Sequence, residues 1–291
     1  MSYSKVSEIL KDSAETGLPF WKLILEEDVR ERGVSEKESF EKMRSMYREM
    51  RRADSSYDGS LRSRSGMAGG DGEKLEAFRK KDNPLLGNFL TEVMAKAVKM
   101  GESNACMRRI VAAPTAGSCG VIPAVLLTYE EQIGAEEDRM VEALYVAGGI
   151  GEVLANSASI AGAEGGCQAE IGSASAMAAG ALSYLRGGDN EAIVNAMALA
   201  IKNMLGLTCD PVAGLVEVPC IKRNISGAVN AVVCCEETAA GIRSRISPDE
   251  VIDSMRRTGK LIPGCLRETG EEGLAVTPSG LRVKKQLSDK K

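Results

Sequence analysis

The sequence predicts an all-α fold: a bundle of small-residue helices around buried central helices, with irregular Gly- and Pro-broken loops that form a site. Aromatic residues make up only 4% of the 291 residues while 31 are glycine, which suits close helix–helix contact better than a strand-rich sandwich. Apolar residues recur at helical spacing through most of the chain. Only 110–113 and 212–218 resemble short strands.

Two helices are predicted near the N-terminus, over 20–33 and 36–52. Pro19 precedes the first and Gly33 ends it, as proline and glycine commonly do at helix boundaries. From Leu75 onward the chain predicts successive helices that start at Ser, Asp or Asn caps and stop at glycine. Their predicted ranges are 87–99, 123–133, 138–154, 171–185, 190–205, 228–241 and 248–258.

The stretches 143–163 and 171–185 are apolar or small on nearly all faces, which predicts helices buried on every side. The domain organisation follows from composition. It comprises N-terminal helices over 1–54, a polar Gly- and Ser-rich loop over 55–72, and a larger domain with the candidate site over 73–291. The N-terminal helices can also pack on that domain, giving one domain overall. The tail from Leu281 is expected to be frayed.

Composition excludes several classes of function. With 37 basic and 41 acidic residues the net charge is −4, so the chain lacks the basic footprint of a nucleic-acid binder. Histidine is absent, which removes Ser-His-Asp triads, Cys-His dyads and His-containing zinc sites built from this chain alone. The sequence also contains neither a P-loop nor a CxxC motif.

The same sequence favours a cytoplasmic protein. The N-terminus lacks the basic and apolar regions of a signal peptide. The longest uncharged run, from Ile110 to Tyr129, is broken by prolines and glycines, so we expect a buried segment and not a membrane span. The eight cysteines should then stay reduced, as core residues, metal ligands or catalysts and not as a disulfide framework.

Three segments are apolar enough to be buried but too rich in glycine and proline to be expected as helices: 113–123, 162–172 and 209–224. Buried irregular backbone commonly forms sites, because its polar groups need partners. Half of the cysteines lie in these segments. They are Cys119, Cys167, Cys209 and Cys220.

The sequence around these cysteines indicates that their thiols can face a cavity. Cys167 follows two glycines and is expected to open a helix, where free N–H groups and the helix dipole favour a thiolate. Cys209 precedes an N-cap pattern at Asp210-Pro211. Three or four thiolates without histidine suit an iron–sulfur cluster or an all-cysteine zinc site. Spacing alone leaves the choice open, since separations of 42 and 11 residues match no short ligand motif.

Long motifs in these segments carry a resemblance to a known family. The stretches are IVAAPTAGSCGVIPAVL, IAGAEGGCQAEIGSASAMAAG, KNMLGLTCDPVAGLVEVPCIKRN and LRETGEEGLAVTPSG, together with the loop RSRSGMAGGD. They resemble the iron–sulfur-dependent L-serine dehydratases, α subunit of the two-chain type, over roughly Leu61 to Gly280. The resemblance implies a lyase that deaminates L-serine to pyruvate and ammonia, in amino-acid degradation and gluconeogenesis.

The resemblance also implies a ligand set and a partner. A [4Fe–4S] cluster would be held by Cys167, Cys209 and Cys220, while Cys119 would line the substrate pocket. Three cysteine ligands leave one iron open to act as a Lewis acid on the substrate hydroxyl. No PLP is expected, and a β subunit is expected as the partner in a heterodimer.

Candidate substrate-binding residues lie near these cysteines. Thr115, Ser118 and the backbone amides up to Gly120 are a candidate nest for the serine carboxylate. Ser118 is also a candidate catalytic group. Arg223 and Asn224 are candidates for hydrogen bonds to cluster sulfide or substrate carboxylate, with a plain salt bridge as the competing interpretation.

The general base is not identified by the sequence. Many relatives carry histidine just before the LGLTCDP stretch, where this chain has Lys202-Asn203-Met204. Lys202 is one candidate if burial lowers its pKa, and a helix-surface lysine is the competing interpretation. The other chain of the family carries a motif of the form SxGPSSSHT, whose histidine could enter the active site from the partner.

Three other functions are weighed against this one. A PLP-dependent dehydratase would need a Ser-x-Lys-x-Arg-Gly segment, which the chain lacks. A structural all-cysteine metal module that mediates interactions would need no open site. A cysteine desulfidase of the same superfamily would expel sulfide in place of water. The motifs distinguish L-serine from L-cysteine as the substrate only weakly.

Overall fold

The structure, a computed structural model that describes residues 3–289, is built from helices. Those residues form thirteen α-helices and four short 3₁₀ or π turns, with no β-strand among them. An isolated β-bridge joins Cys209 to Arg267. The predicted all-α class is therefore confirmed. Within the described part of the chain, no helix is both long and apolar enough to cross a membrane.

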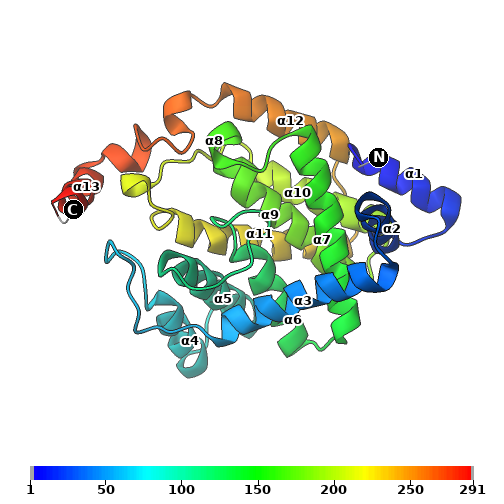
Figure 1. The fold of residues 1–291 in the computed structure, drawn as a ribbon, viewed down its shortest axis with the longest axis horizontal. Helices are drawn as coiled ribbons and strands as arrows, with labels where there is room; N and C mark the ends of the chain where they lie inside the picture. The colour runs from blue at the N-terminus through cyan, green and yellow to red at the C-terminus, as the bar shows by residue number, and fades with distance from the viewer. Residues whose placement is uncertain (1–2, 290–291) are drawn as a thin grey trace.

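The centre of the bundle is α9 (Ser173–Leu185), in which every residue is buried. It packs against four helices, which Figure 1 shows around it. These are α6 (Val121–Gln132), α7 (Glu137–Ser157), α10 (Asn190–Met204) and α11 (Cys220–Ala239). Alanine, serine and glycine dominate α9, so its neighbours approach closely: a Cβ on Gly180 would lie 2.2 Å from Ile150 Cδ1. The buried central helix expected over 171–185 is thus present.

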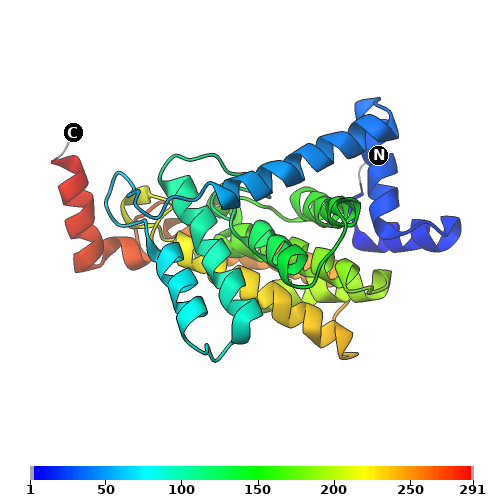
Figure 2. The ribbon, with the colours of Figure 1, turned by 90° about the horizontal axis from the view of Figure 1, so that it is seen from below.

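The N-terminal helices share the hydrophobic core of the bundle. They are α1 (Val6–Thr16), α2 (Phe20–Arg32) and α3 (Glu36–Ser55). Phe20 and Ile24 of α2 pack on Gly149 of α7, where an added Cβ would lie 2.5 Å from Ile24 Cδ1. Figure 2 shows α3 as a long helix running across the bundle. The division into 1–54, 55–72 and 73–291 stays a prediction.

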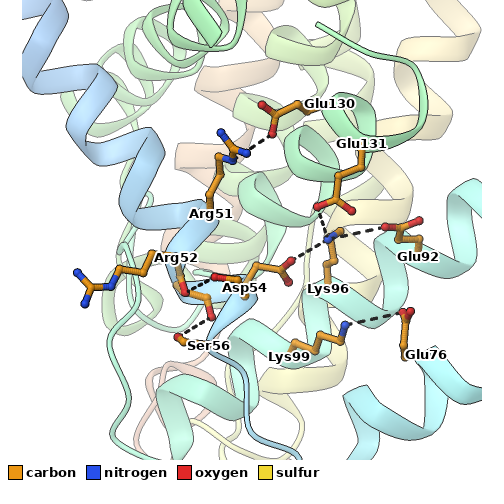
Figure 3. Close-up of polar contacts among 12 residues, drawn as sticks. Arg51, Arg52, Asp54, Ser56, Glu76, Glu92, Lys96, Lys99, Glu130 and Glu131 are labelled. Carbon is orange, nitrogen blue, oxygen red and sulfur yellow. Dashed lines mark hydrogen bonds and ion pairs between the residues drawn. The ribbon is translucent and has the colours of Figure 1, made fainter. Parts of the chain in front are cut away.

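A buried ion cluster ties α3 to α6 and to α5 (Gly87–Ala105). Lys96 of α5 is 4% exposed, and its Nζ lies 2.7 Å from Asp54 Oδ2 and 2.9 Å from Glu131 Oε1. Glu92 Oε1 lies 3.7 Å away, one turn earlier on the same helix. Figure 3 shows the lysine between these carboxylates. The buried ammonium group of Lys96 therefore has carboxylate partners on α3, on α6 and on its own helix. These ion pairs hold α3 in its position across the bundle.

The remaining elements surround the candidate site or extend from it. They are α4 (Asp71–Lys81), α8 (Gly162–Gly165), the π turn η1 (Gln168–Gly172), η2 (Val212–Gly214), α12 (Pro248–Leu261), η3 (Gly264–Leu266), η4 (Gly273–Val276) and α13 (Pro278–Ser288). α1 and α13 lie at opposite ends of the longest dimension (Figures 1 and 2). The segments around α8, η2 and η3 lie between these ends, on one side of the α9 core.

Several predicted boundaries are wrong. α11 begins at Cys220 and not at 228, because its first two turns carry polar residues, such as the exposed Lys222, whose pattern after a proline resembles that of a loop. Residues 212–218 contain the 3₁₀ turn η2, and 110–113 has no strand partner among the described residues. Within the described residues, the tail predicted to be frayed from Leu281 is helical as far as Ser288 in α13, whose start is capped by the Thr277 hydroxyl accepting a hydrogen bond from Gly280 N; residues 290–291 lie outside the described part.

The irregular segments are also more helical than predicted. The segment 113–123 ends in the first turn of α6, and 162–172 contains the single turn α8 and the π turn η1. α1 and α4 were not predicted, and the predicted loop over 55–72 shortens because α3 ends at Ser55 and α4 begins at Asp71.

Candidate active site

The structure brings Cys167 of the segment 162–172 together with Cys209 and Cys220, which lie at opposite ends of the irregular part of the segment 209–224. Their exposed fractions are 1%, 2% and 4%, and none forms a disulfide. Cys167 and Cys209 share a small buried cluster with Ile171. The thiols act on one another: a hydrogen bond with Cys167 is the largest of the effects that raise the pKa of Cys209, and Cys220 adds to them. Burial raises the pKa of Cys220 to about 12. Three buried sulfurs therefore lie within electrostatic range of each other.

Backbone contacts explain how each cysteine is held. Cys167 follows Gly166, whose φ of 75° suits glycine, and opens the helical run that continues through η1 into α9. Cys209 pairs with the 264–268 segment: its N–H donates to Leu266 O at 2.8 Å, and Glu268 N–H donates to its carbonyl at 2.8 Å. Cys220 is the first residue of α11. The predicted helix opening at Cys167 is present, but Asp210 does not cap a helix.

Arg223 is the cation of this site. Its Nη1 donates to Cys167 Sγ at 3.3 Å and to Thr208 O at 2.8 Å, while Nη2 pairs with Asp210 Oδ1 at 2.8 Å. The other carboxylate oxygen of Asp210 accepts from Leu274 N at 2.9 Å. Hydrogen bonding with Cys209 and the Arg223 charge lower the pKa of Cys167 against the effect of burial. Arg223 therefore makes both a hydrogen bond to a cysteine sulfur and a salt bridge to Asp210, the two kinds of contact considered as alternatives from the sequence.

Asn224 holds the loop over 113–120 and faces the backbone. It is 1% exposed; its Nδ2 donates to Gly117 O at 2.8 Å and its Oδ1 accepts from Gly120 N at 2.9 Å. Nδ2 also donates to Cys220 O at 3.0 Å. Gly120 is needed there, because a Cβ would lie 2.4 Å from Ala97 O. Asn224 thus links the loop to the helix that carries Cys220.

The donors of the predicted anion nest face a carboxylate of the chain itself. Thr115 Oγ1 lies 2.9 Å from Ser118 Oγ and donates to Glu170 Oε1. A Cβ on Gly117 would lie 2.5 Å and 2.7 Å from the two Glu170 carboxylate oxygens. Ser118 is fully buried. The loop is therefore an anion-holding loop in this structure, with Glu170 as the anion.

Glu170 was missed by the sequence analysis. It lies in the π turn η1, three residues after Cys167. Burial raises its pKa, the Thr115 hydrogen bond opposes that effect, and the nearby Glu268 charge adds to it. Its one sequence signal was a lone acidic residue in the otherwise apolar or small run CQAEIGSASAMAAG.

Cys119 and Lys202 form no hydrogen bond or ion pair with these groups that the structure shows within residues 3–289. Cys119 is 1% exposed, its Sγ donates to Met100 O at 3.7 Å, and burial raises its pKa to about 12. Lys202 is a half-buried residue of α10 and takes part in no hydrogen bond or ion pair that the structure shows within residues 3–289. Its role as a base stays a prediction without support from a contact.

A helical bundle that gathers buried thiols, an arginine and a carboxylate from irregular segments defines a class: all-α proteins with a cysteine-lined polar site. The comparisons narrow this class. The sequence model of the family described as "Serine dehydratase alpha chain" matches residues 15–275. The chain belongs to this family, as the resemblance predicted.

Curated relatives agree. The "Probable L-serine dehydratase, alpha chain" of Bacillus subtilis is 50% identical over 225 residues, 77% of this chain and 75% of the relative. The "L-serine dehydratase, alpha chain" of Peptoniphilus asaccharolyticus is 38% identical over 281 residues, 96% of both chains. The "L-serine dehydratase" of Streptomyces coelicolor is 47% identical over 182 residues, which are 62% of this chain but 40% of that protein.

Within residues 3–289, no group of three or more His, Cys, Asp or Glu side chains is arranged around a point where a metal ion could bind. A cluster makes a different demand, because each cysteine needs to reach only its own iron atom at one corner of the cluster. The absence of a site for a single metal ion among the described residues therefore does not decide whether these cysteines hold a cluster. What bears on that question is whether their side chains are suitable ligands for iron.

Proposed function

We propose that this chain is the α subunit of an L-serine dehydratase, a lyase that converts L-serine to pyruvate and ammonia. One observation carries the proposal: the chain aligns over 96% of its length with a protein named "L-serine dehydratase, alpha chain". The arrangement of Cys167, Arg223 and Glu170 supports it, since the site offers both thiol ligands and acid–base groups. The reaction would belong to amino-acid degradation and gluconeogenesis in the cytoplasm.

The cofactor of this proposal is a [4Fe–4S] cluster held by Cys167, Cys209 and Cys220. The donor set fits: the three thiols are buried, form no disulfide and are close enough to perturb one another, and no histidine competes as ligand in this chain. The hydrogen bond from Arg223 to Cys167 Sγ fits as well, because hydrogen bonds to ligand sulfurs tune such clusters. When bound, the cluster would supply a Lewis-acidic iron for the substrate hydroxyl.

The protein groups have separate tasks in this scheme. Arg223 keeps Cys167 and Asp210 in fixed positions, and Asn224 keeps the loop over 113–120 against α11. Thr115 holds the Glu170 carboxylate and Ser118 Oγ lies 2.9 Å from the Thr115 hydroxyl, so a direct contact of either residue with the substrate carboxylate stays a prediction from the sequence. Gly120 lets the loop approach α5. PLP has no part in this scheme.

The partner of this chain would be a β subunit, forming a heterodimer. The Streptomyces relative supports this, because the matched region fills only 40% of that protein and leaves room for a second part in the same polypeptide. A second chain would supply the corresponding part here. The active site would then lie where the two chains meet, and either chain could contribute residues to it.

The test is a pyruvate assay on the anaerobically purified complex of both chains. L-serine and L-cysteine are compared as substrates at equal concentration. Pyruvate formed faster from L-serine, with ammonia in equal amount, is the expected result. Sulfide released faster from L-cysteine would replace the proposal with a desulfidase. No turnover of either amino acid, with zinc bound in place of iron, would favour a structural metal module.

A further inference from the structure

Glu170 has an unusual position for a carboxylate. From Gly165 to Leu185 every residue is buried except Glu170, which keeps some solvent access. It lies in the π turn η1 (Gln168–Gly172), and π turns inside helices occur frequently at functional sites. Glu170 is therefore the one residue of this buried stretch with solvent access, and its side chain is ionisable.

The contacts of Glu170 leave it available for chemistry. Burial and the Glu268 carboxylate raise the pKa of Glu170, and hydrogen bonds from the Thr115 hydroxyl and the Gly117 amide lower it. No cation is among the groups that act on this pKa in the described chain. A hydroxyl donor holds Oε1, and the close approach of Gly117 fixes the direction of the carboxylate. The group is thus oriented without being neutralised.

Structural carboxylates in the same chain look different. Glu102 accepts from the backbone N–H groups of Gly69, Asp71 and Gly72 at 3.1, 2.9 and 3.2 Å, and also from a tyrosine hydroxyl. Those donors use most of its acceptor capacity. Glu170 has one such side-chain donor, so lone pairs remain to accept a proton.

Glu170 also lies close to the thiols. Its charge is among the causes that raise the pKa of Cys119 and of Cys220, and it acts in the same direction on Cys167. A substrate placed against the three predicted ligand cysteines would therefore be within reach of the electrostatic field of this carboxylate. Lys202, the base suggested by the sequence, forms no hydrogen bond or ion pair with these segments that the structure shows within residues 3–289.

We propose that Glu170 is the base that removes the α-proton of L-serine, an inference that rests on the proposed function. The Cα–H bond breaks, the proton moves to a Glu170 carboxylate oxygen, and the electron pair forms the Cα=Cβ bond. The Cβ–O bond breaks with its electron pair on oxygen, and the departing hydroxide takes a proton from solvent and leaves as water. The 2-aminoacrylate tautomerises to an imine, which one water hydrolyses to pyruvate and ammonia. Glu170 then releases its proton to solvent.

The experiment uses the assembled two-chain enzyme with its cluster. Glu170→Gln keeps the shape of the side chain and removes the basic oxygen. Glu164→Gln is the matched control, since Glu164 lies six residues earlier on α8, is exposed and bonds to Ser159 at 2.7 Å. We expect kcat for L-serine to fall at least about 100-fold in Glu170→Gln, the usual range for loss of a general base, and to stay within about two-fold of wild type in the control.

Two further readouts separate a base from a structural residue. Iron per chain in Glu170→Gln should equal that of wild type. Adding L-serine to the anaerobic variant should still raise its Tm, because binding remains when proton removal is lost. Glu170→Asp serves as the second variant if the glutamine variant does not fold; a displaced carboxylate should lower kcat at least about ten-fold with unchanged iron content.

Each outcome decides the matter. Undiminished kcat in either folded Glu170 variant would overturn the proposal, because another group would then be the base. Loss of iron, or of the L-serine-induced rise in Tm, together with loss of activity would overturn it in favour of a structural role. Failure of the wild-type complex to make pyruvate from L-serine would refute the proposed function itself, and that result is obtained before any variant is compared.

Discussion

Replacing Asn224 with alanine should detach the loop over 113–120 from α11, the helix that supports it. The amide side chain makes hydrogen bonds of 2.8 Å to Gly117 O and 2.9 Å from Gly120 N, and it is 1% exposed. The third bond, to Cys220 O, is dispensable because that carbonyl can accept from the α11 backbone. Asn224→Ala therefore strands one buried carbonyl and one buried N–H.

The magnitude follows from these two groups. A buried polar group left without its partner costs about 1–3 kcal/mol, so the pair predicts a loss of about 2–5 kcal/mol after partial relaxation. At about 2.1 cal/mol/K per residue, the unfolding entropy of 291 residues is about 0.6 kcal/mol/K. The variant should therefore melt about 3–8 °C below wild type.

The assay is thermal unfolding of both proteins under identical anaerobic conditions, supported by urea titration to check that the m-value is unchanged. Asn203→Ala is the matched control: Asn203 is exposed on α10, and its Nδ2 donates to Asn230 Oδ1 at 2.7 Å and only weakly to Cys234 Sγ at 3.4 Å, so its loss should shift Tm by about 1 °C or less. An Asn224→Ala variant as stable as this control would refute the hydrogen-bond argument for the loop.

Three other substitutions test the framework. Lys96→Met should cost about 3–5 kcal/mol in urea unfolding, because its carboxylate partners lose their buried cation. Burial lowers the pKa of Lys96, but its carboxylate partners raise it by more, so its pKa in the folded protein lies above the usual value. The stability that the substitution removes should therefore be fully present below about pH 10.4 and decrease as the pH rises above it. Gly117→Ala should displace Glu170 and lower kcat at least about ten-fold at unchanged iron content. Arg223→Met should destabilise by about 3–5 kcal/mol, partly recovered by Asp210→Asn; a fully additive double variant would contradict the pairing.

The fold was predictable where the pattern was strong. The run over 171–185 has no polar face, and the structure buries every residue of α9. Capping signals gave the start of α12, where Ser247 Oγ accepts from Glu250 N as the capping box requires. The start of α11 was not predictable in the same way: its first turn carries the charged residues Lys222 and Arg223, and a polar stretch after a proline resembles a loop.

The site divides along a similar line. The Gly- and Pro-rich segments marked the cysteines, because irregular apolar backbone is rare enough to stand out. Side-chain partners across the fold carry no local signal. The contact between Thr115 and Glu170 spans 55 residues, and the bond between Asn224 and Gly120 spans 104. Only the folded chain could show that a partly buried carboxylate of the chain itself, Glu170, occupies the loop predicted to bind one.

The central claim is that three cysteines hold a [4Fe–4S] cluster, and iron and acid-labile sulfide analysis of the anaerobically purified complex tests it most directly. Serine variants of Cys167, Cys209 and Cys220 are compared with Cys106→Ser, a half-buried cysteine outside the three site segments. The account predicts about four irons and four sulfides per chain in wild type and in Cys106→Ser, and a marked loss in each of the other three. Full iron in any of those three variants, or zinc in wild type, would contradict it.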